Sequence, residues 1–450
     1  MPPILALALG TGFIAWLMRK DMAARGRLSS AMWVPFLWLL IHGSRPVTTW
    51  VHIGGGGGGD AEGNVYEAAI ALALFIAAFS ILQRRAFVWN RLVYLNVAFF
   101  VILGYLALST VWSPFPFIAF KRWSKEFGNV LIALVILTEK DSAESFKVVL
   151  VRCAYILFPM SVVLIKYYPR FGRGFSVEGF PMVTGVTDQK NSLGLICCVF
   201  GLALVWDMFD ELKQGARRGF WKRLLPQEIT LAIGMWLLLT SESKTSLLAL
   251  LAGTAIFLSP VLGILRRHST LLARTCVVVV PVLLIVAAVN TVVFAPALEA
   301  VGRDTTFTER TKIWHAVLDQ PINPVLGMGY FSFWLEYREA VQAEGVPQDN
   351  AHNGYLEMYL DGGMVGCALL AIFLLTTCWR MAGAFSPGSS FSRVTFAIAI
   401  VALITNFAEV YFFRLDTLWF CLVFSALATR AVSATPAPAS AQFIDVEIAP

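Results

Sequence analysis

Residues 351–366 read AHNGYLEMYLDGGMVG, and this stretch marks the point at which the chain passes from water into the membrane. It closes the only long polar segment of the sequence and opens an apolar run. The pair His352–Asn353 is therefore expected at the interface, within reach of a substrate with an apolar tail and a polar head. Because histidine titrates near neutral pH, it can exchange a proton with a hydroxyl or a phosphate. The alternative is that the pair caps a helix.

The composition predicts an all-α, polytopic membrane protein. Hydrophobic residues make up 58% of the 450 residues, charged residues 14%, and the mean hydropathy is +0.70. Soluble proteins carry roughly 25% charged residues, so this chain is expected to be solvated mainly by lipid. The small cation excess, without a basic stripe interleaved with aromatics, argues against nucleic acid as a partner. The seven cysteines all lie in apolar runs without metal-ligand spacing, which predicts small core residues.

The apolar runs predict 12 or 13 transmembrane helices, since about 20 helical residues cross a bilayer. The first run has no small-residue cleavage site, so it is expected to be retained. We expect N-terminal transmembrane helices in residues 1–180, a core in 181–432 with a periplasmic loop at 295–355, and a disordered cytoplasmic tail at 433–450. The runs are residues 4–18, 31–43, 65–82, 92–112, 127–138, 148–165, 191–208, 229–240, 245–265, 271–294, 356–378, 393–409 and 415–432.

The distribution of cations predicts the orientation of the chain. Alternate loops and their flanks hold 21 of the 35 lysines and arginines, and the positive-inside rule makes that side cytoplasmic. The other side carries the remaining 14 and includes residues 54–59, 166–190 and 295–355. His352 is therefore expected outside the cytoplasm.

Several of the outer cations lie close to membrane ends, where selection usually removes them. This placement predicts an anionic ligand. Ordinary solvated loop charge is the alternative; it suits Arg338, which stands among glutamates, better than Lys244, which lies in a turn of a few residues between two apolar runs. The outer cations of interest are Arg170, Arg173, Lys190, Lys244, Arg303 and Arg310.

The long outer loop is predicted to fold over the membrane face. Residues Phe307, Ile313, Trp314, Val317 and Leu318 recur at near-helical spacing, which places Arg310 on an amphipathic helix. Prolines at 321 and 324 end this helix, and a second helix is expected at about residues 332–344.

Four segments in sequence order resemble the O-antigen ligase and polysaccharide polymerase superfamily, most closely the exopolysaccharide polymerases of the ExoQ type. The fourth segment shows the superfamily's pattern of His-Asn, nine residues, Gly, two residues and Gly. The segments are GVTDQKNSLG (185–194), SESKTSLLALLAG (241–253), GRDTTFTERTKIW (302–314) with PVLGMGYFSFW (324–334), and AHNGYLEMYLDGGMVG (351–366).

The resemblance implies a metal-independent, inverting glycosyl transfer without a cofactor, on the periplasmic face of a bacterial inner membrane. It implies a donor glycan on undecaprenyl diphosphate. The acceptor would be another lipid-linked repeat unit in a polymerase, or lipid A–core in a ligase. A chain-length regulator is a further expected partner. Carried over to this chain, the resemblance implies catalytic roles for His352 and Arg310, and substrate-binding roles for Lys190, Asn191, Lys244, Arg303, Asn353, Arg170 and Arg173.

The residues themselves agree with this chemistry. Arginine and lysine can neutralise a leaving diphosphate without a metal, and a neutral histidine can take the proton of an acceptor hydroxyl. Asp349 and Glu357 flank His352 and are expected to orient it. Whether His352 is a base or a hydrogen-bonding guide stays open at this level.

Two other classes of protein fit the sequence less well. A secondary transporter or flippase usually shows internal repeats or broken helices with charges at mid-membrane. The two halves of this sequence show no such repeat, and its charged motifs lie at outer helix ends. A membrane scaffold leaves the outer cations without a role.

Overall fold

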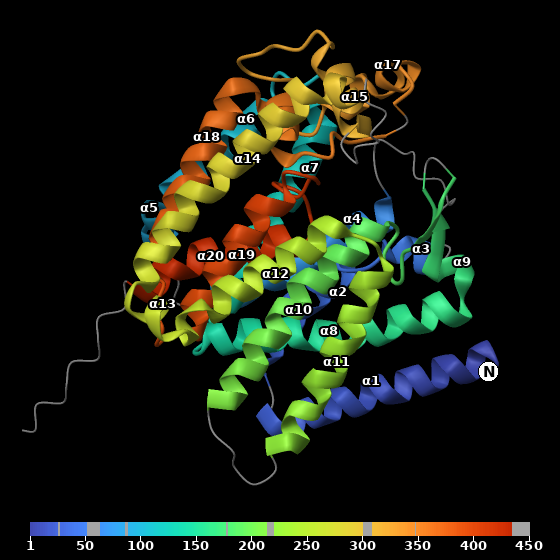
Figure 1. The fold of residues 1–450 in the computed structure, drawn as a ribbon, viewed down its shortest axis with the longest axis vertical. Coiled ribbons are helices and arrows are strands. Elements are labelled where there is room, and N and C mark those ends of the chain that lie inside the picture. The colour runs from blue at the N-terminus through green and yellow to red at the C-terminus, as the bar shows by residue number, and fades with distance from the viewer. Residues whose placement is uncertain are drawn as a thin grey trace, which may run out of the picture.

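The computed structural model describes residues 1–25, 28–51, 64–85, 89–176, 179–213, 220–299, 308–346 and 348–433. Arg303, the glycine run 54–59 and the predicted tail, apart from Ser433, lie outside these ranges. Figure 1 shows that the described part is built of helices, with a single short hairpin of two antiparallel strands. The predicted all-α membrane class is confirmed.

The elements follow one another with short connections. In chain order they are α1 (Pro3–Arg25), η1 (Ser30–Met32), α2 (Trp33–His42), α3 (Val47–Val51), α4 (Val65–Gln83), α5 (Trp89–Leu95), α6 (Val97–Ser109), α7 (Pro116–Leu137), α8 (Ser142–Tyr167), α9 (Pro169–Gly172), β1 (Arg173–Phe175), β2 (Pro181–Val183), α10 (Lys190–Lys213), α11 (Phe220–Thr240), α12 (Lys244–Leu258), η2 (Ser259–Val261), α13 (Gly263–Arg267), α14 (Ser269–Glu299), α15 (Thr308–Leu318), α16 (Phe333–Glu336), α17 (Arg338–Ala343), α18 (Gly354–Ala384), α19 (Ser390–Thr405) and α20 (Thr417–Ser433).

Every predicted apolar run forms helix over most of its length, but the helices differ in how well they fit a bilayer. Among the described residues, seven helices are long and apolar enough to span a membrane, and α5 with α6 makes an eighth if the pair, bent by 96°, is one span. Four further apolar helices have 10–17 residues, fewer than the roughly 20 that a bilayer requires. The helix α7 has 22 residues and is long enough to span a bilayer, but its first half carries charged residues such as Lys121 and Glu126. The 12 or 13 predicted transmembrane helices thus correspond to apolar helices of the structure. Among the described residues, however, seven or eight of these helices are long and apolar enough to be complete membrane spans.

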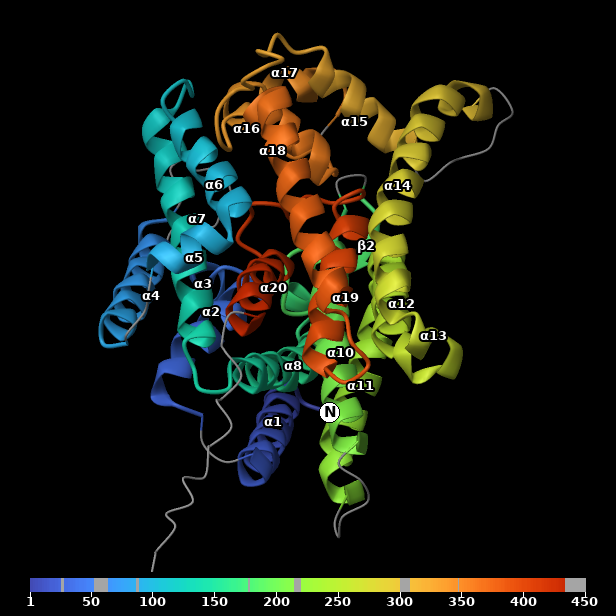
Figure 2. The same cartoon turned by 90° about the vertical axis from the view of Figure 1, so that its left-hand side faces the viewer.

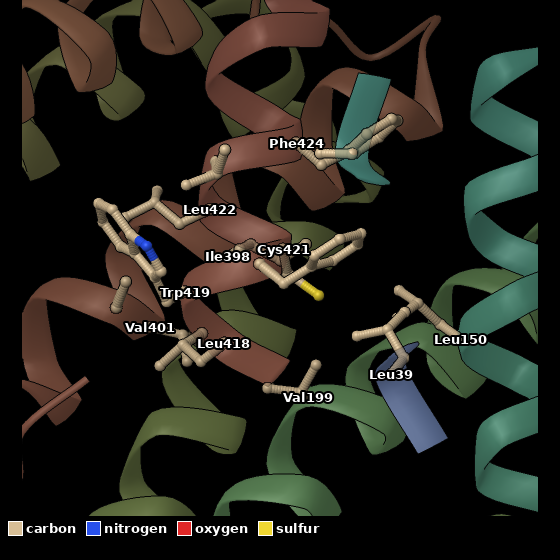
Figure 3. Close-up of a cluster of buried hydrophobic side chains, with 14 of the residues drawn as sticks. Leu39, Leu150, Val199, Ile398, Val401, Leu418, Trp419, Cys421, Leu422 and Phe424 are labelled. Atoms are coloured by element: carbon tan, nitrogen blue, oxygen red, sulfur yellow. The ribbon is translucent and has the colours of Figure 1, made fainter. Parts of the chain in front are cut away.

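The helices at the centre of the molecule are buried on all sides. In α8 and α10, 83% and 78% of the apolar stretch is buried, compared with 11% in α1 and α14, which face outward. Figure 3 shows Leu39 of α2, Leu150 of α8 and Val199 of α10 converging with side chains of α19 and α20. We call the side of the molecule that carries the predicted periplasmic loop the outer side. Because α10, α19 and α20 pack in this core, their ends on this side are held at fixed positions relative to one another.

The predicted amphipathic helix is α15, and it belongs to a small outer cap with α16 and α17 (Figure 2). Ile313, Trp314 and Val317 of α15 are buried in a separate apolar cluster, and Leu318 is exposed. The predicted Phe307 lies outside the described residues. The second predicted helix is divided into α16 and α17 at Tyr337.

A backbone break in α18 explains the glycines of the 351–366 stretch. Gly363 has φ +61°, which interrupts the helix, and a strap formed by residues 324–329 lies against the break. Met328 N–H donates to the Leu360 carbonyl at 2.9 Å, and Met364 N–H donates to the first carbonyl of the strap at 2.9 Å. A side chain at Gly363 would collide with the strap, so glycine is required both for the dihedral angle and for the close approach.

Candidate active site

The centre of the candidate site is Glu409, in the loop 406–416 between α19 and α20. Asn191 Nδ2 at the start of α10 donates to Glu409 Oε1 at 2.6 Å, and Arg310 Nη2 of α15 lies 3.5 Å from the same oxygen. His352 Nδ1 lies 3.2 Å from Glu409 Oε2. We call these four residues the Glu409 cluster. It unites three residues that the sequence predicts for the site and that lie far apart along the chain.

The contact with Glu409 determines which nitrogen of His352 carries the proton. An ionised carboxylate only accepts hydrogen bonds, so Nδ1 must be the donor. In the neutral imidazole this leaves the lone pair on Nε2, which is the atom able to accept a proton from a hydroxyl. The side chain of His352 is 21% exposed, so a substrate can reach it.

The backbone around His352 is held on both sides. His352 has φ +46°, a left-handed conformation, and its N–H donates to Asn350 Oδ1 at 3.0 Å. The preceding Ala351 accepts from Trp314 Nε1 at 3.0 Å and donates to Glu357 Oε2 at 3.1 Å. A non-glycine residue keeps such a conformation when its surroundings impose it, and this is common at functional sites.

Backbone strain is concentrated on the same side of the molecule. Among the described non-glycine residues, positive φ angles occur in the turn before α12, just after the strap, at His352, and in the loop that carries Glu409. Each of these segments lies at the outer ends of the helices, by the predicted orientation. The residues are Glu242, Phe331, His352 and Phe413.

The alternative of a helix cap applies to Asn353. Its Oδ1 accepts from Tyr355 N–H at 3.0 Å and from Leu356 N–H at 3.1 Å, which caps α18. Gly354 N–H then donates to the carbonyls of Asn406 and Glu409 at 2.7 and 2.9 Å, which ties the start of α18 to the Glu409 loop. The cap accounts for the Asn353 oxygen, while a role in substrate binding stays a prediction.

The expectation that Glu357 orients His352 has to be corrected. Glu357 Oε1 and Asp361 Oδ2 bind Arg414 Nη2 at 2.9 and 3.2 Å, and the Arg414 guanidinium lies 3.6 Å from the ring centroid of Phe331. Burial alone would lower the pKa of Arg414, but the two carboxylates outweigh it and hold this pKa above its usual value. Glu357 therefore binds Arg414 and not His352. The carboxylate that contacts the His352 imidazole is that of Glu409.

Two predicted cations lie beside the Glu409 cluster without belonging to it. Lys190 is the first residue of α10, next to Asn191. One turn later a Cβ at Gly194 would lie 2.5 Å from Ser243 Cβ, so the turn before α12 packs against the start of α10. Lys244 follows that turn and is exposed, and none of the ion pairs of the described residues involves Lys190 or Lys244.

The remaining predicted cations are not brought to the cluster. Arg170 is exposed on α9, and Arg173 is exposed on β1, where its Nε donates to the Ile165 carbonyl at 3.0 Å. No contact among the described residues joins either of them to Glu409. Their role in binding stays a prediction, as does that of Arg303.

An apolar groove leads away from the site into the membrane region. A cavity of about 430 Å³ lies between α14, α18 and α19, lined by Leu284, Leu374 and Leu403 among others. Asn353 and Phe407 lie at its end next to the Glu409 cluster. The volume and the apolar lining suit a hydrocarbon chain whose polar end lies near His352.

The sequence reasoning missed Glu409 and Arg414. Glu409 is the last residue of the run 393–409, and Arg414 lies in the connection between that run and the last one. An ionisable residue at a membrane end is a functional candidate on physical grounds, and this signal was available. What the sequence did not show is which other residues it would meet.

The comparison with known families covers part of the chain that forms the site. Residues 229–371 match the model of the O-antigen ligase family. The resemblance predicted from the four segments is confirmed. The last three segments, with Lys244, Arg310 and His352, lie inside the matched region, whereas Asn191 and Glu409 lie outside it.

A curated relative extends the similarity over more of the chain. Over 343 residues the chain is 24% identical to the exopolysaccharide production protein ExoQ of Rhizobium meliloti (strain 1021), which covers 68% of this chain and 74% of that protein. Both comparisons therefore show similarity to proteins of the O-antigen ligase and polymerase type. Among the described residues no group of three or more histidine, cysteine, aspartate or glutamate side chains is placed to hold a metal ion, and metal independence stays a prediction.

Proposed function

We propose that this protein is an inner-membrane glycosyltransferase that polymerises lipid-linked repeat units of an exopolysaccharide or O-antigen on the periplasmic face. The observation that carries the proposal is the Glu409 cluster at the end of the apolar groove. A groove for hydrocarbon, cations for a diphosphate and an imidazole for a hydroxyl are the three parts that such a transfer requires.

The donor in this proposal is a glycan on undecaprenyl diphosphate. Its polyprenyl chain enters between α14 and α18, and its diphosphate lies at the outer end of the groove, near Arg310. Lys190 at the start of α10 and Lys244 at the start of α12 add positive charge. These cations neutralise the charge that develops on the leaving group, which is the largest contribution that an enzyme makes to this kind of reaction.

The acceptor is the hydroxyl of a second glycan, activated by His352. In one inverting displacement the acceptor oxygen forms a bond to the anomeric carbon of the donor, and the bond from that carbon to the diphosphate oxygen breaks. The electron pair of the broken bond leaves with undecaprenyl diphosphate, and the acceptor proton moves to His352 Nε2. The resulting imidazolium is stabilised by Glu409, which accepts the Nδ1–H bond throughout.

Glu409 has a second task, which is to place Arg310. The carboxylate holds the guanidinium at 3.5 Å while it holds the imidazole at 3.2 Å, so both catalytic groups share one anchor. The Asn191 hydrogen bond fixes the rotation of that carboxylate. The distance between diphosphate and base is thereby set by one side chain.

The second candidate function is that of a ligase, which transfers finished glycan to lipid A–core. The name of the matched family supports it, and the name of the relative supports a polymerase. Deleting the gene and sizing the cellular glycans separates the two. Surviving single units without long chains support a polymerase, and intact lipid-linked polymer that never reaches its acceptor supports a ligase. A polymerase is also expected to act with a chain-length regulator.

The direct test uses purified protein in nanodiscs with an undecaprenyl-diphosphate-linked repeat unit. We expect ladders of polymer with release of undecaprenyl diphosphate, unchanged by EDTA. His315 offers a matched control, because it is an exposed histidine on α15 of the same outer cap. His315→Ala is expected to retain activity that His352→Ala lacks. A requirement for added Mg²⁺ would overturn the assignment of the diphosphate to Arg310.

The orientation is tested separately by labelling. In intact spheroplasts a membrane-impermeant thiol reagent should modify Glu339→Cys on α17 and spare Arg267→Cys on α13, since both residues are exposed at opposite ends of the helices. The reverse pattern would place the Glu409 cluster in the cytoplasm.

A further inference from the structure

A second cavity lies at the end of the molecule opposite the Glu409 cluster. It has a volume of about 240 Å³ and lies between α1, the start of α2 and α8. Its lining is mostly apolar and includes Met18, Met22, Met32, Trp33 and Phe36. Figures 1 and 2 both show α1 far from the cap formed by α15 and α17. The proposed glycosyl transfer makes no use of this cavity.

One charged side chain lines this apolar cavity, and it is not fully paired. The Arg152 side chain is 10% exposed, and its Nε donates to Asp21 Oδ2 at 2.7 Å. Its Nη2 is buried and has no hydrogen-bond partner among the described residues. A buried donor without an acceptor is costly, so an acceptor from outside the chain is expected to lie against it.

The cavity lies at the level of lipid headgroups. Arg19 and Lys20, on the same stretch of α1, are exposed, and Trp33 at the cavity wall is 60% exposed. Exposed tryptophan and basic residues near a helix end are typical of the membrane–water interface. The carboxylate nearest to Arg152 is that of Asp21, which already binds both Arg152 and Arg25. Asp21 accepts from Arg152 at Nε, so among the described residues Nη2 is left without an acceptor.

We propose that this cavity binds an anionic phospholipid of the leaflet opposite the Glu409 cluster. The lipid phosphate accepts from Arg152 Nη2, and one acyl chain lies along Met18, Met32 and Phe36. Flexible methionines suit an acyl chain because they adapt to its shape. The apolar lining argues for a lipid over a free phosphate ion. A basic group recessed between transmembrane helices is a known way to select anionic lipids.

The test measures lipid binding to the full-length protein, purified in detergent, by native mass spectrometry. Dioleoylphosphatidylglycerol is the probe, and dioleoylphosphatidylcholine has the same chains on a zwitterionic head. We expect the anionic lipid to be retained and to raise the Tm, with roughly tenfold weaker retention of the zwitterionic lipid. Equal retention of the two lipids would overturn the proposal.

Variants locate the site. Met22→Trp should close the mouth of the cavity and remove the retained lipid, whereas Leu9→Trp, on an exposed position of α1 outside the cavity, should not. Arg152→Lys keeps the charge and the partner Asp21 but loses Nη2, so retention should fall roughly tenfold. Met18→Trp serves if Met22→Trp does not fold. Unchanged retention in these cavity variants would overturn the location.

Inorganic phosphate separates a lipid from a free anion. Millimolar phosphate should neither displace the lipid nor raise the Tm of delipidated protein. If phosphate alone reproduced the rise in Tm and Arg152→Lys abolished it, the ligand would be a soluble anion and the lipid assignment would be wrong.

Discussion

The two ends of this protein both bury charged side chains, but they pair them differently. At the outer end one carboxylate, that of Glu409, is shared by an amide, a guanidinium and an imidazole. At the inner end cations and carboxylates of α1, α8 and α10 form ion pairs with one another. We call this set the inner network; its members are Asp21, Arg25, Glu144, Lys147, Arg152, Asp207 and Asp210.

The difference indicates what each end is for. Arg25 binds Asp21 at 2.9 Å, Glu144 at 3.3 Å and also Asp207, so it joins α1 to the central helices α8 and α10. The charge of Arg25 is thus neutralised by carboxylates of the protein itself, as expected of a residue that stabilises the packing of helices. At the outer end Lys190 and Lys244 have no ion-pair partner among the described residues, which leaves positive charge for a ligand. We therefore expect outer variants to change turnover and inner variants to change stability.

The largest expected effect is the loss of turnover in His352→Ala. Chain growth should fall below detection, because the remaining basic group of the Glu409 cluster, the Glu409 carboxylate, is held by Asn191 and Arg310, while protein level and Tm stay close to the wild type. His352→Gln, which can still donate to Glu409 but cannot accept a proton, should also be inactive. Product ladders from purified protein measure both. Substantial polymer from the glutamine variant would show that His352 only orients the acceptor.

Arg25→Ala should have the opposite profile. Removing one partner of a buried ion pair costs about 3–5 kcal/mol, because the remaining carboxylates stay buried without a counter-charge. The Tm and the amount of inserted protein should fall, while turnover per folded molecule stays the same. Thermal unfolding and activity normalised to folded protein are the measurements. A selective loss of turnover at unchanged Tm would mean that the inner end takes part in the reaction.

Arg310→Ala should lower the rate by about 10²–10³, by analogy with the loss of one oxyanion donor. Arg310→Lys keeps the charge but loses the forked geometry, so its rate should lie between those of the alanine variant and the wild type. The rate with saturating lipid-linked donor is the readout. Equal rates for the lysine and alanine variants would show that the fork matters and the charge does not.

Glu409→Gln should lower the rate by roughly tenfold to a hundredfold, within the range of a positioned acid–base group. The amide has a single acceptor oxygen, so it can accept from Asn191 Nδ2 or from His352 Nδ1 but not from both, and it does not stabilise an imidazolium. The pH profile of the rate is the informative measurement, since the substitution removes the negative charge that faces the His352 imidazole. A variant with wild-type rate and profile would reduce Glu409 to a packing role.

The smallest expected effect concerns Asp416, next to the outer site. Burial raises the pKa of this carboxyl from 3.8 to about 8, although its Oδ1 accepts from Leu418 N–H at 2.8 Å and Trp419 N–H at 2.9 Å. The folded protein thus favours the protonated form, and the stability that this provides is lost as the pH rises from about 4 to about 8. Asp416→Asn keeps the cap without titrating, so its Tm should depend less on pH in that window. Parallel Tm curves for the two proteins would contradict this assignment.

The strap illustrates which features of the tertiary structure could be predicted from the sequence. The pattern of Gly363 and Gly366 after His352 was visible in the sequence, and the family resemblance followed from it. The physical reason for Gly363, a break in α18 against residues 324–329, required the structure. A glycine in a helical run is compatible with several local conformations, and the contact partner decides among them.

What the sequence by itself determined is the medium, the helices and part of the site. A chain with this hydropathy is solvated by lipid, and each apolar run became a helix because in lipid the backbone must satisfy its own hydrogen bonds. Local periodicity also placed Arg310 on a helix, because Ile313, Trp314 and Val317 needed burial on one face.

What only the tertiary structure decided is the meeting at Glu409. Glu409 is separated by 57 residues from His352 and by 218 from Asn191, and no local propensity reports which loops meet across such distances. The packing of α10, α19 and α20 in one core, together with the docking of α15 on the start of α18, brings these side chains together. The residue types predicted the chemistry of the site, and the burial of the helices that carry these residues determined its geometry.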